Sequence, residues 1–598
     1  MSPSEIHELF VIALGLHNSG KLSDAEKIYQ SILAAHPDHP DAIHLLGFLA
    51  HQRGQCQLAA HLVQKAIRIN PRNSEYYATL GAAFLRLGQY LDCIKACGKA
   101  VAMNPRLPHA LNSLGLALIR VDDAQPAAAA AAARSALALE NNRNPEESYR
   151  ILGAALSLMG QPSEAAAAFR ESLRLQPDCS DVRSDLIFTM QHDPACDEKT
   201  IAAELAEWNR LHVVPLRHLI QPHHIDRSPD RRLRIGWVSA DFCQHVLAYC
   251  VLPIFQEFDS NRFKNFCYSS VLLPDDMTDR IRGAVDTWRD ICQVSDQRAA
   301  EIIRSDRIDI LVDLGLHSGG NRVTLFALKP APIQVSYLGY CGSTGLETMD
   351  YRISDPYIDP PDSDLSRYSE RTVFLPDSFL LYRPMMTPPD VSPLPSLSEG
   401  CVTFGCLNSF TKVSRSVLLL WAQIMRAAPA SRLLLHAPPG GCQQQLLAEF
   451  QHWGLSPDRF QFVPHQSWKG YIETYNRIDI ALDPFPYGGG VTTCDALLMG
   501  VPVIALRGTT AAGRLSYSIL CNIGRSDLAA DTPQRYVEIA AALAANPARL
   551  FDLRSNLRLA LQTSPVMDPS ATAVNLGNLF LEIWEKYLRN TAPTRLNE

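Results

Sequence analysis

A period of 34 residues runs through the first third of the chain and constrains the fold more than any other feature of the sequence. Two series of glycines keep this period: Gly20, Gly54 and Gly88, and Gly47, Gly81 and Gly115. Prolines keep it as well, and alanines and leucines fill the helical positions between these landmarks. A single helical pair cannot bury its apolar face alone, so the period predicts a stack of helical pairs, an α-solenoid.

The landmarks resemble those of tetratricopeptide repeats, in which proline separates successive units. The unit between Gly115 and Gly153 is four residues longer, and the alanine-rich segment 122–135 would absorb the insertion. We expect about five units between residues 5 and 180, and hence a tetratricopeptide-repeat superhelix over residues 1–180. The concave face of such a solenoid commonly binds a peptide or another protein. Residues 181–230 keep a helical period without the landmarks and predict a helical adaptor.

The composition is that of a globular protein with several domains. The chain has 598 residues, of which 47% are hydrophobic and 20% charged, and this length implies about three domains. A net charge of -7 argues against nucleic acid as a partner. We expect no membrane span, because no apolar stretch reaches about 18 residues, and no export signal, because "MSPSEIHELF" lacks a basic region followed by an apolar one. The 15 scattered cysteines include no C-x-x-C pair and favour a reduced, cytoplasmic protein.

Strands and helices alternate from Leu233 onward. Short β-rich runs such as "LRIGWVS" and "IDILVDLG" are separated by amphipathic helical stretches, which predicts a parallel, doubly wound sheet over residues 231–390. A proline-rich seam at 383–400 precedes a second alternation, over residues 400–590. The pattern therefore predicts two Rossmann-like lobes. Ligands of such sheets bind at the carboxyl ends of the strands, so we expect the site in the cleft between the lobes.

Chemically capable residues gather after the expected strands. In the first lobe these are Asp241, His245, Asp313, His317 and the loop 338–345. In the second lobe they are Lys412, His465 and the stretch "GGGVTTCD", residues 488–495. The glycines would leave backbone N–H groups open at the start of a helix, where an anion is stabilised. A lysine beside such a helix start suits a nucleoside diphosphate.

Two longer sequence motifs indicate a resemblance to a known protein family. With the repeats, "APIQVSYLGYCGSTGLETMDYRISD" and "LDPFPYGGGVTTCDALLMGVPVIAL" resemble the protein O-GlcNAc transferases of glycosyltransferase family 41, in particular their bacterial homologues. The resemblance covers essentially the whole chain. It implies a GT-B fold closed by a final crossing helix, and inverting, metal-independent transfer of GlcNAc from UDP-GlcNAc to serine or threonine of proteins. Protein or peptide acceptors would bind between the repeat groove and the catalytic cleft.

The resemblance also implies roles for individual residues. Lys412 would contact the diphosphate, and His245 would face the sugar and acceptor as a candidate base, with an oxygen of the donor phosphate as the alternative base. The expected donor-binding residues are Lys412, Gly489, Gly490, Thr492, Thr493, Asp495, His465 and Gln466. The expected sugar and acceptor pocket contains Asp241, His317, Gly339, Tyr340 and Gly342. His317 could instead shape its loop through a hydrogen bond, and Asp495 could be a plain first-turn carboxylate rather than a ribose ligand.

Alternatives to this function remain open at the level of sequence. Relatives with the same fold use other sugar nucleotides, so GDP-fucose or UDP-glucose could be the donor. The chain could also be a repeat scaffold joined to a transferase module without turnover. The D-x-D pattern at Asp362 and Asp364 lies in a proline-flanked loop without a strand before it, which argues against a metal site. We therefore expect no metal and no cofactor.

Overall fold

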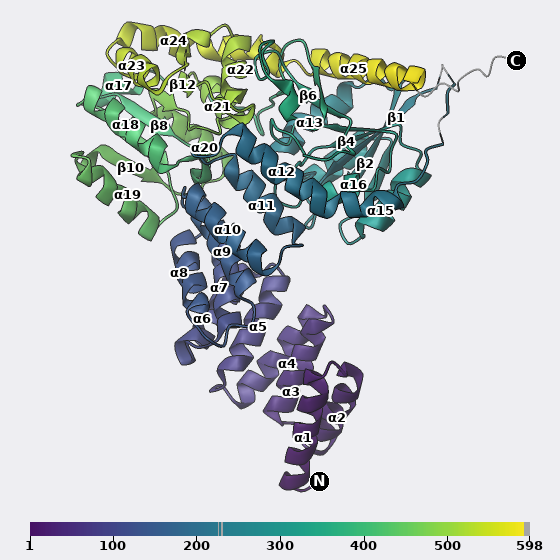
Figure 1. The fold of residues 1–598 in the computed structure, drawn as a ribbon. Coiled ribbons are helices and arrows are strands. Elements are labelled where there is room, and N and C mark those ends of the chain that lie inside the picture. Colours follow the sequence, from purple (N-terminus) through teal and green to yellow (C-terminus); the bar gives the residue numbers. More distant parts are fainter. Residues whose placement is uncertain (225, 229–230, 591–598) are drawn as a thin grey trace, which may run out of the picture. The chain divides into compact units, whose positions relative to one another are not determined.

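The computed structural model describes residues 1–224, 226–228 and 231–590 (Figure 1). The chain divides into two compact units. The first contains Met1–Met159, Ala167–Pro177 and Pro438–Gln444, and the second contains the rest of the described chain. Among the described residues, no helix is both long enough and apolar enough to span a bilayer.

Ten helices follow one another between Pro3 and Leu175, as expected for five helical pairs. Their bounds are α1 Pro3–Asn18, α2 Leu22–Ala35, α3 Pro40–Gln52, α4 Cys56–Ile69, α5 Ser74–Arg86, α6 Tyr90–Met103, α7 Pro108–Arg120, α8 Pro126–Leu137, α9 Pro145–Leu158 and α10 Pro162–Leu175. From α1 to α9 each helix packs against the next, so the predicted stack is confirmed.

The two series of glycines have different structural roles. Gly54 lies in the turn between α3 and α4 with φ of +78°, a conformation that side chains with a Cβ rarely adopt. Gly81 lies inside α5, where an added Cβ would be 2.2 Å from the sulfur of Cys97 on α6. The first series therefore permits the turns, and the second permits close approach of paired helices.

The predicted adaptor consists of three helical segments: α11 Ser180–Met190, α12 Glu198–His212 and η1 Val214–Leu219. Helix α11 packs against α12, and the indole of Trp208 is buried beneath α12. Residues 225, 229 and 230 of the predicted adaptor lie outside the described part of the chain.

The first lobe contains a parallel sheet of seven strands in the order β3-β2-β1-β4-β5-β6-β7. The strands are β1 Leu233–Ser239, β2 Phe263–Ser269, β3 Thr287–Asp290, β4 Ile310–Asp313, β5 Ile333–Ser336, β6 Tyr351–Ser354 and β7 Arg371–Phe374. The connecting helices are α13 Val246–Glu257, α14 Asp276–Ala284, α15 Asp296–Ser305, α16 Val323–Ala327 and η2 Leu365–Arg367. The strand order reverses direction at β1 and β4, which places the sheet's ligand crevice beside the loops that follow these two strands.

The second lobe contains a parallel sheet of six strands in the order β10-β9-β8-β11-β12-β13. The strands are β8 Thr403–Cys406, β9 Arg432–His436, β10 Phe460–Val463, β11 Ile480–Leu482, β12 Val503–Leu506 and β13 Ala529–Ala530. The helical segments are α17 Pro395–Glu399, η3 Phe410–Lys412, α18 Arg415–Ala427, α19 Gly441–His452, η4 Pro457–Arg459, α20 Trp468–Thr474, η5 Tyr475–Arg477, α21 Val491–Leu498, η6 Ala512–Arg514, α22 Leu515–Asn522, η7 Ser526–Leu528, α23 Pro533–Ala544, α24 Pro547–Gln562 and η8 Pro565–Met567. The prediction of two Rossmann-like lobes is therefore confirmed.

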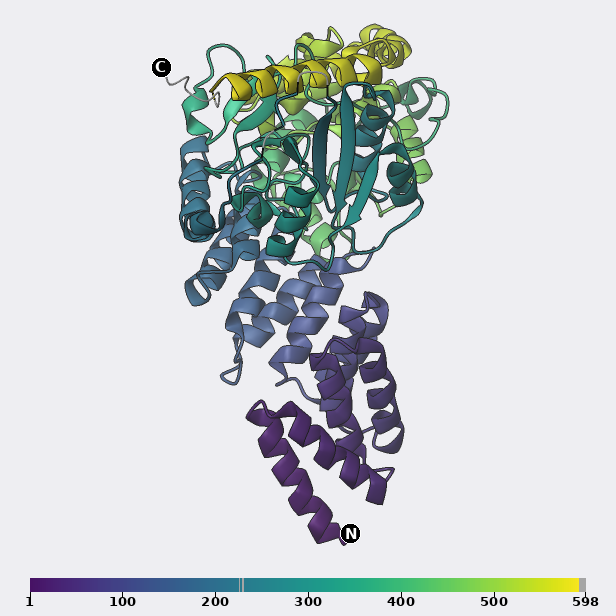
Figure 2. The same ribbon diagram turned by 90° about the vertical axis from the view of Figure 1, so that its right-hand side faces the viewer.

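The last helix, α25 Pro569–Asn590, returns from the second lobe to the first (Figure 2). It packs against α13, and Phe580 meets Trp237 of β1 with ring centroids 5.9 Å apart. Helix α25 thus follows the second lobe in the chain and packs against the first.

Candidate donor-binding site

Lys412 ends the short segment η3 that follows β8. Its Nζ donates a hydrogen bond of 2.8 Å to the carbonyl oxygen of Gly488 and lies 4.3 Å from the ring centroid of Tyr487. Burial lowers the pKa of Lys412 to about 8, although the nearby carboxylate of Asp483 opposes this shift. The structure therefore brings the predicted lysine and the predicted glycine loop together.

Asp483, directly after β11, fixes the shape of the glycine loop. Its buried carboxylate accepts hydrogen bonds from the backbone N–H of Gly489, at 2.9 and 3.1 Å, and from the hydroxyl of Ser516, at 2.7 Å. An added Cβ on Gly489 would lie 2.6 Å from this carboxylate, so only glycine fits there. Burial raises the pKa of Asp483 to about 6, against the hydrogen bond from Ser516 and the charge of Lys412. Sequence reasoning missed this residue, whose signal is its place at the end of the buried run "IDIALD".

Helix α21 begins after Gly490, and no side chain caps its first backbone N–H groups. Thr492 donates its hydroxyl to Oδ1 of Asn408 at 2.6 Å, which ties the helix start to the loop after β8. The hydroxyl of Thr493 lies 3.2 Å from that of Ser516. The first turn of the helix is thus fixed in place beside Lys412, with N–H groups suited to an anion.

Asp495 lies one turn further into α21 and is buried. Its two carboxylate oxygens accept hydrogen bonds from Tyr382, at 2.6 Å, and from Tyr471, at 3.0 Å. Burial raises its pKa to about 6, and the two tyrosine hydroxyls oppose the shift. No motif in the sequence indicated these tyrosine partners, and the ribose contact of Asp495 stays a prediction.

His465 and Gln466 follow β10, the edge strand of the second sheet. His465 is exposed, and the half-buried Gln466 accepts a hydrogen bond from Thr474 at 3.4 Å. Both follow the carboxyl end of their strand, the end at which ligands of such sheets bind. Their contact with uracil stays a prediction.

In the first lobe, His245 precedes α13 and acts as its N-cap. Its Nδ1 accepts a hydrogen bond of 3.3 Å from the backbone N–H of Leu247, and the nearest oxygen of Asp241 is 3.7 Å from the same nitrogen. Accepting this bond leaves the proton of the neutral ring on Nε2, which makes that nitrogen a donor. The geometry therefore favours an orienting role for His245 over the role of base.

His317 is almost fully buried, and both of its ring nitrogens are engaged. Nε2 lies 2.8 Å from the carbonyl oxygen of Thr344 and Nδ1 lies 3.0 Å from the hydroxyl of Ser184 on α11. Burial lowers the pKa of His317 to about 4, so the ring is neutral at physiological pH. Of the two predicted roles, these contacts favour the one in which His317 holds the loop after β5.

Gly339, Tyr340 and Gly342 belong to that same loop. An added Cβ on Gly339 would lie 2.7 Å from the carbonyl oxygen of Leu314, so the loop passes very close to the one after β4. Further along, Glu370 accepts hydrogen bonds of 2.6 Å from the hydroxyl of Ser343 and from the backbone N–H of Thr344. Glu370 was not predicted as a site residue, although it holds the loop that borders the cleft.

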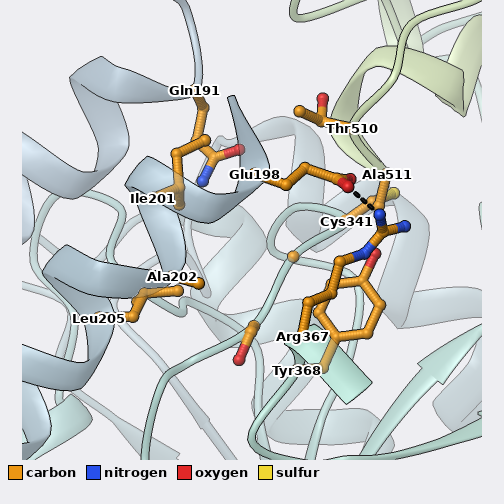
Figure 3. Close-up of a pocket in the computed structure, with 12 residues that line it drawn as sticks. Gln191, Glu198, Ile201, Ala202, Leu205, Cys341, Arg367, Tyr368, Thr510 and Ala511 are labelled. Carbon is orange, nitrogen blue, oxygen red and sulfur yellow. Dashed lines mark hydrogen bonds and ion pairs between the residues drawn. The ribbon is translucent and has the colours of Figure 1, made fainter. Parts of the chain in front are cut away.

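A small cavity lies behind this loop (Figure 3). It is lined by α12, by the loop itself and by Thr510 and Ala511 of the second lobe, and an ion pair between Glu198 and Arg367 crosses it. Its interior offers about 30 Å³ to water, enough for about two molecules. The cavity is therefore too small for a sugar, and it shows instead that α12 backs the loop.

Comparison with known proteins places the chain in a family. The sequence pattern described as "Glycosyl transferase family 41" matches residues 184–387 and 394–576, and a tetratricopeptide-repeat pattern matches residues 16–84. The chain belongs to glycosyl transferase family 41. This confirms the family that the two motifs indicated. No group of three or more His, Cys, Asp or Glu side chains among the described residues is arranged to hold a metal ion.

Several curated relatives of this family-41 chain are named as probable peptide N-acetylglucosaminyltransferases. "Probable UDP-N-acetylglucosamine--peptide N-acetylglucosaminyltransferase SPINDLY" of Petunia hybrida is 34% identical over 435 residues, which are 71% of this chain and 46% of the relative. A protein named in the same way, but SEC, from Arabidopsis thaliana is 30% identical over 375 residues, 61% of this chain and 38% of the relative. This chain thus spans about half the length of the curated relatives it matches.

A solved structure matches much more of both chains. It is an O-GlcNAc transferase of Thermobaculum terrenum, in a lysine-to-methionine variant, with a TM-score of 0.79 and 31% identity. The match covers 87% of this chain and 98% of the other. It confirms the predicted solenoid followed by a GT-B fold.

Proposed function

We propose that this chain transfers GlcNAc from UDP-GlcNAc to serine or threonine hydroxyls of proteins, with inversion at the sugar and without a metal ion. The observation that carries the proposal is the meeting of Lys412 with the glycine loop and the uncapped start of α21. The names of the curated relatives and of the Thermobaculum terrenum structure support the donor sugar and the peptide acceptor.

The reaction follows from the charges in this site. The acceptor oxygen forms a bond to C1 of the sugar on the face opposite the diphosphate, and the bond from C1 to the β-phosphate oxygen breaks. The negative charge that develops on UDP is stabilised by the ammonium of Lys412 and by the N–H groups of α21. The acceptor's proton passes to a phosphate oxygen of the donor, because the hydrogen bond from Leu247 favours His245 with its proton on Nε2. His245 then orients a reacting group rather than accepting the proton.

The pH dependence of the reaction tests the charge of Lys412. The protonated lysine is the active form, and burial lowers its pKa to about 8. We expect kcat/KM to be level near pH 7 and to fall as the pH rises through about 8. Well above pH 8, kcat/KM should fall about tenfold for each pH unit. In Lys412→Arg the guanidinium stays charged, so any residual activity should lack this basic limb. A wild-type profile that is level to pH 9.5 would contradict the assignment.

Chelators test the absence of a metal requirement. Dialysis against EDTA is expected to leave the initial rate of transfer within about twofold, because the lysine and the helix start already neutralise the leaving group. The measurement is transfer of radiolabelled GlcNAc to a protein acceptor before and after dialysis. Loss of the rate with EDTA and its return with Mn²⁺ would show that the mechanism needs a metal.

The choice of donor is tested by hydrolysis without acceptor. UDP-GlcNAc, UDP-glucose and GDP-fucose are incubated with the full chain, and the released nucleotide is measured. We expect the highest rate with UDP-GlcNAc. A preference for GDP-fucose or UDP-glucose would reassign the donor, and an absence of binding and turnover with all three would favour the scaffold.

A further inference from the structure

An aromatic cluster connects the adaptor to the candidate donor site. The ring of His192, just after α11, stacks on the ring of Tyr487 with centroids 4.8 Å apart and an interplanar angle of 10°. Phe188 of α11 meets Tyr487 edge-on at 6.2 Å and Tyr340 of the first lobe at 5.6 Å. Since Lys412 lies over the ring of Tyr487, one tyrosine contacts both the adaptor and the lysine.

The ring of His192 is buried and neutral. Its Nδ1–H donates to the carbonyl oxygen of Phe188 at 3.0 Å, which fixes the ring's orientation. Burial, and next the positive charge of Lys412, lower the pKa of His192 to about 3. His192 therefore adds no positive charge beside the ammonium of Lys412 at physiological pH.

A lysine needs such support because its side chain is long and flexible. Its four-carbon stem has large rotamer entropy, whereas electrostatic catalysis requires a charge that is held in place before the reaction. An aromatic face attracts an ammonium group by about 0.5 to 2 kcal/mol, more where water is excluded. Besides the Gly488 carbonyl, the charged or titratable groups that act on the pKa of Lys412 are Asp483, Cys406 and Cys341.

We propose that His192 and Tyr487 are positioning residues that hold the Lys412 ammonium against the glycine loop, so that the adaptor helix α11 forms part of the donor site. This inference rests on the proposed role of Lys412. It assigns to the adaptor a function in donor binding beyond joining the repeats to the catalytic lobes. His192 acts through the ring of Tyr487, and it does not itself touch the donor.

Paired variants of the full chain separate this role from simple packing. His192→Ala and Tyr487→Leu remove a ring, whereas His192→Phe and Tyr487→Phe keep it. We expect the first two to weaken UDP binding in calorimetry about fivefold to tenfold, and the second two to remain within about twofold of wild type. Circular dichroism and thermal melting identify any variant that fails to fold. If one variant fails, the Ala/Phe pair at His192 or the Leu/Phe pair at Tyr487 that still folds tests the positioning role.

The second readout is the titration of Lys412 itself. Its rate of acylation by a lysine-selective reagent is followed against pH, by mass spectrometry of the peptide that contains it. Loss of the His192 ring admits water to the ammonium group, so the midpoint should move upward from about 8 in His192→Ala and stay at about 8 in His192→Phe.

Failure of the inference and failure of the proposed function give different results. If Lys412→Met weakens UDP binding but His192→Ala and His192→Phe behave alike, only the positioning role is wrong. If Lys412→Met leaves UDP binding and transfer unchanged, the proposed function loses its support whatever the ring variants do.

Discussion

Replacing Lys412 with methionine is expected to lower kcat for sugar transfer by about 10²- to 10³-fold, the usual effect of removing one preorganised electrostatic donor. Methionine keeps much of the aliphatic stem against Tyr487 but removes the charge. The fold should be unaffected, since among the described residues the side chain donates one hydrogen bond, to the Gly488 carbonyl. Steady-state kinetics with UDP-GlcNAc and a protein acceptor, together with thermal melting, provide the measurement.

A lysine elsewhere in the same lobe is the matched control. Lys469 on α20 is exposed and 3.8 Å from Glu473, so Lys469→Met should leave kcat within about twofold and stability within about 0.5 kcal/mol. Equal activity in Lys412→Met and Lys469→Met would overturn the electrostatic assignment.

Asp359→Ala is expected to cost about 3 to 5 kcal/mol of stability, because it leaves a buried guanidinium without its partner. The carboxylate of Asp359 is fully buried and accepts a hydrogen bond of 2.7 Å from Arg352, which is 1% exposed. It also accepts from Ser354 at 2.6 Å and from Tyr368 at 2.9 Å, and Arg514 of the second lobe lies 3.4 Å away. The substitution therefore weakens both the first lobe and its junction with the second.

Urea unfolding followed by tryptophan fluorescence measures this loss. The control is Glu301→Ala, which breaks an exposed pair with Arg298 on α15 and should change the free energy of unfolding by at most about 0.5 kcal/mol. Coincident unfolding midpoints for Asp359→Ala and Glu301→Ala would show that the buried pair does not stabilise the protein.

The sequence revealed those parts of the fold that depend on local pattern. Each repeat glycine serves either a turn with positive φ, as at Gly54, or a close contact with the next helix, as at Gly81. Both requirements arise within one repeat, so the period of the glycines was enough to predict the helical pairs. Strands alternating with helices predicted two parallel sheets, and the rule that ligands bind at carboxyl ends brought Lys412 and the glycine loop together. The structure adds that a hydrogen bond joins the two.

The supports of the site could not be predicted because they come from remote elements. The sequence left two roles open for His317, and its contact with Ser184, 133 residues away, favours one of them. His192 lies in the segment predicted only as a helical adaptor, and only the packing of the folded chain places its ring against Tyr487. Asp483 and Glu370 likewise act through loops whose course depends on the tertiary fold.

The most direct test of the central claim is a crystal structure of the full chain with UDP. The account predicts that oxygens of the diphosphate lie within hydrogen-bonding distance of Lys412 Nζ and of the backbone N–H groups in the first turn of α21. A UDP molecule whose phosphates contact neither of these, while Lys412 remains bonded to Gly488, would contradict it.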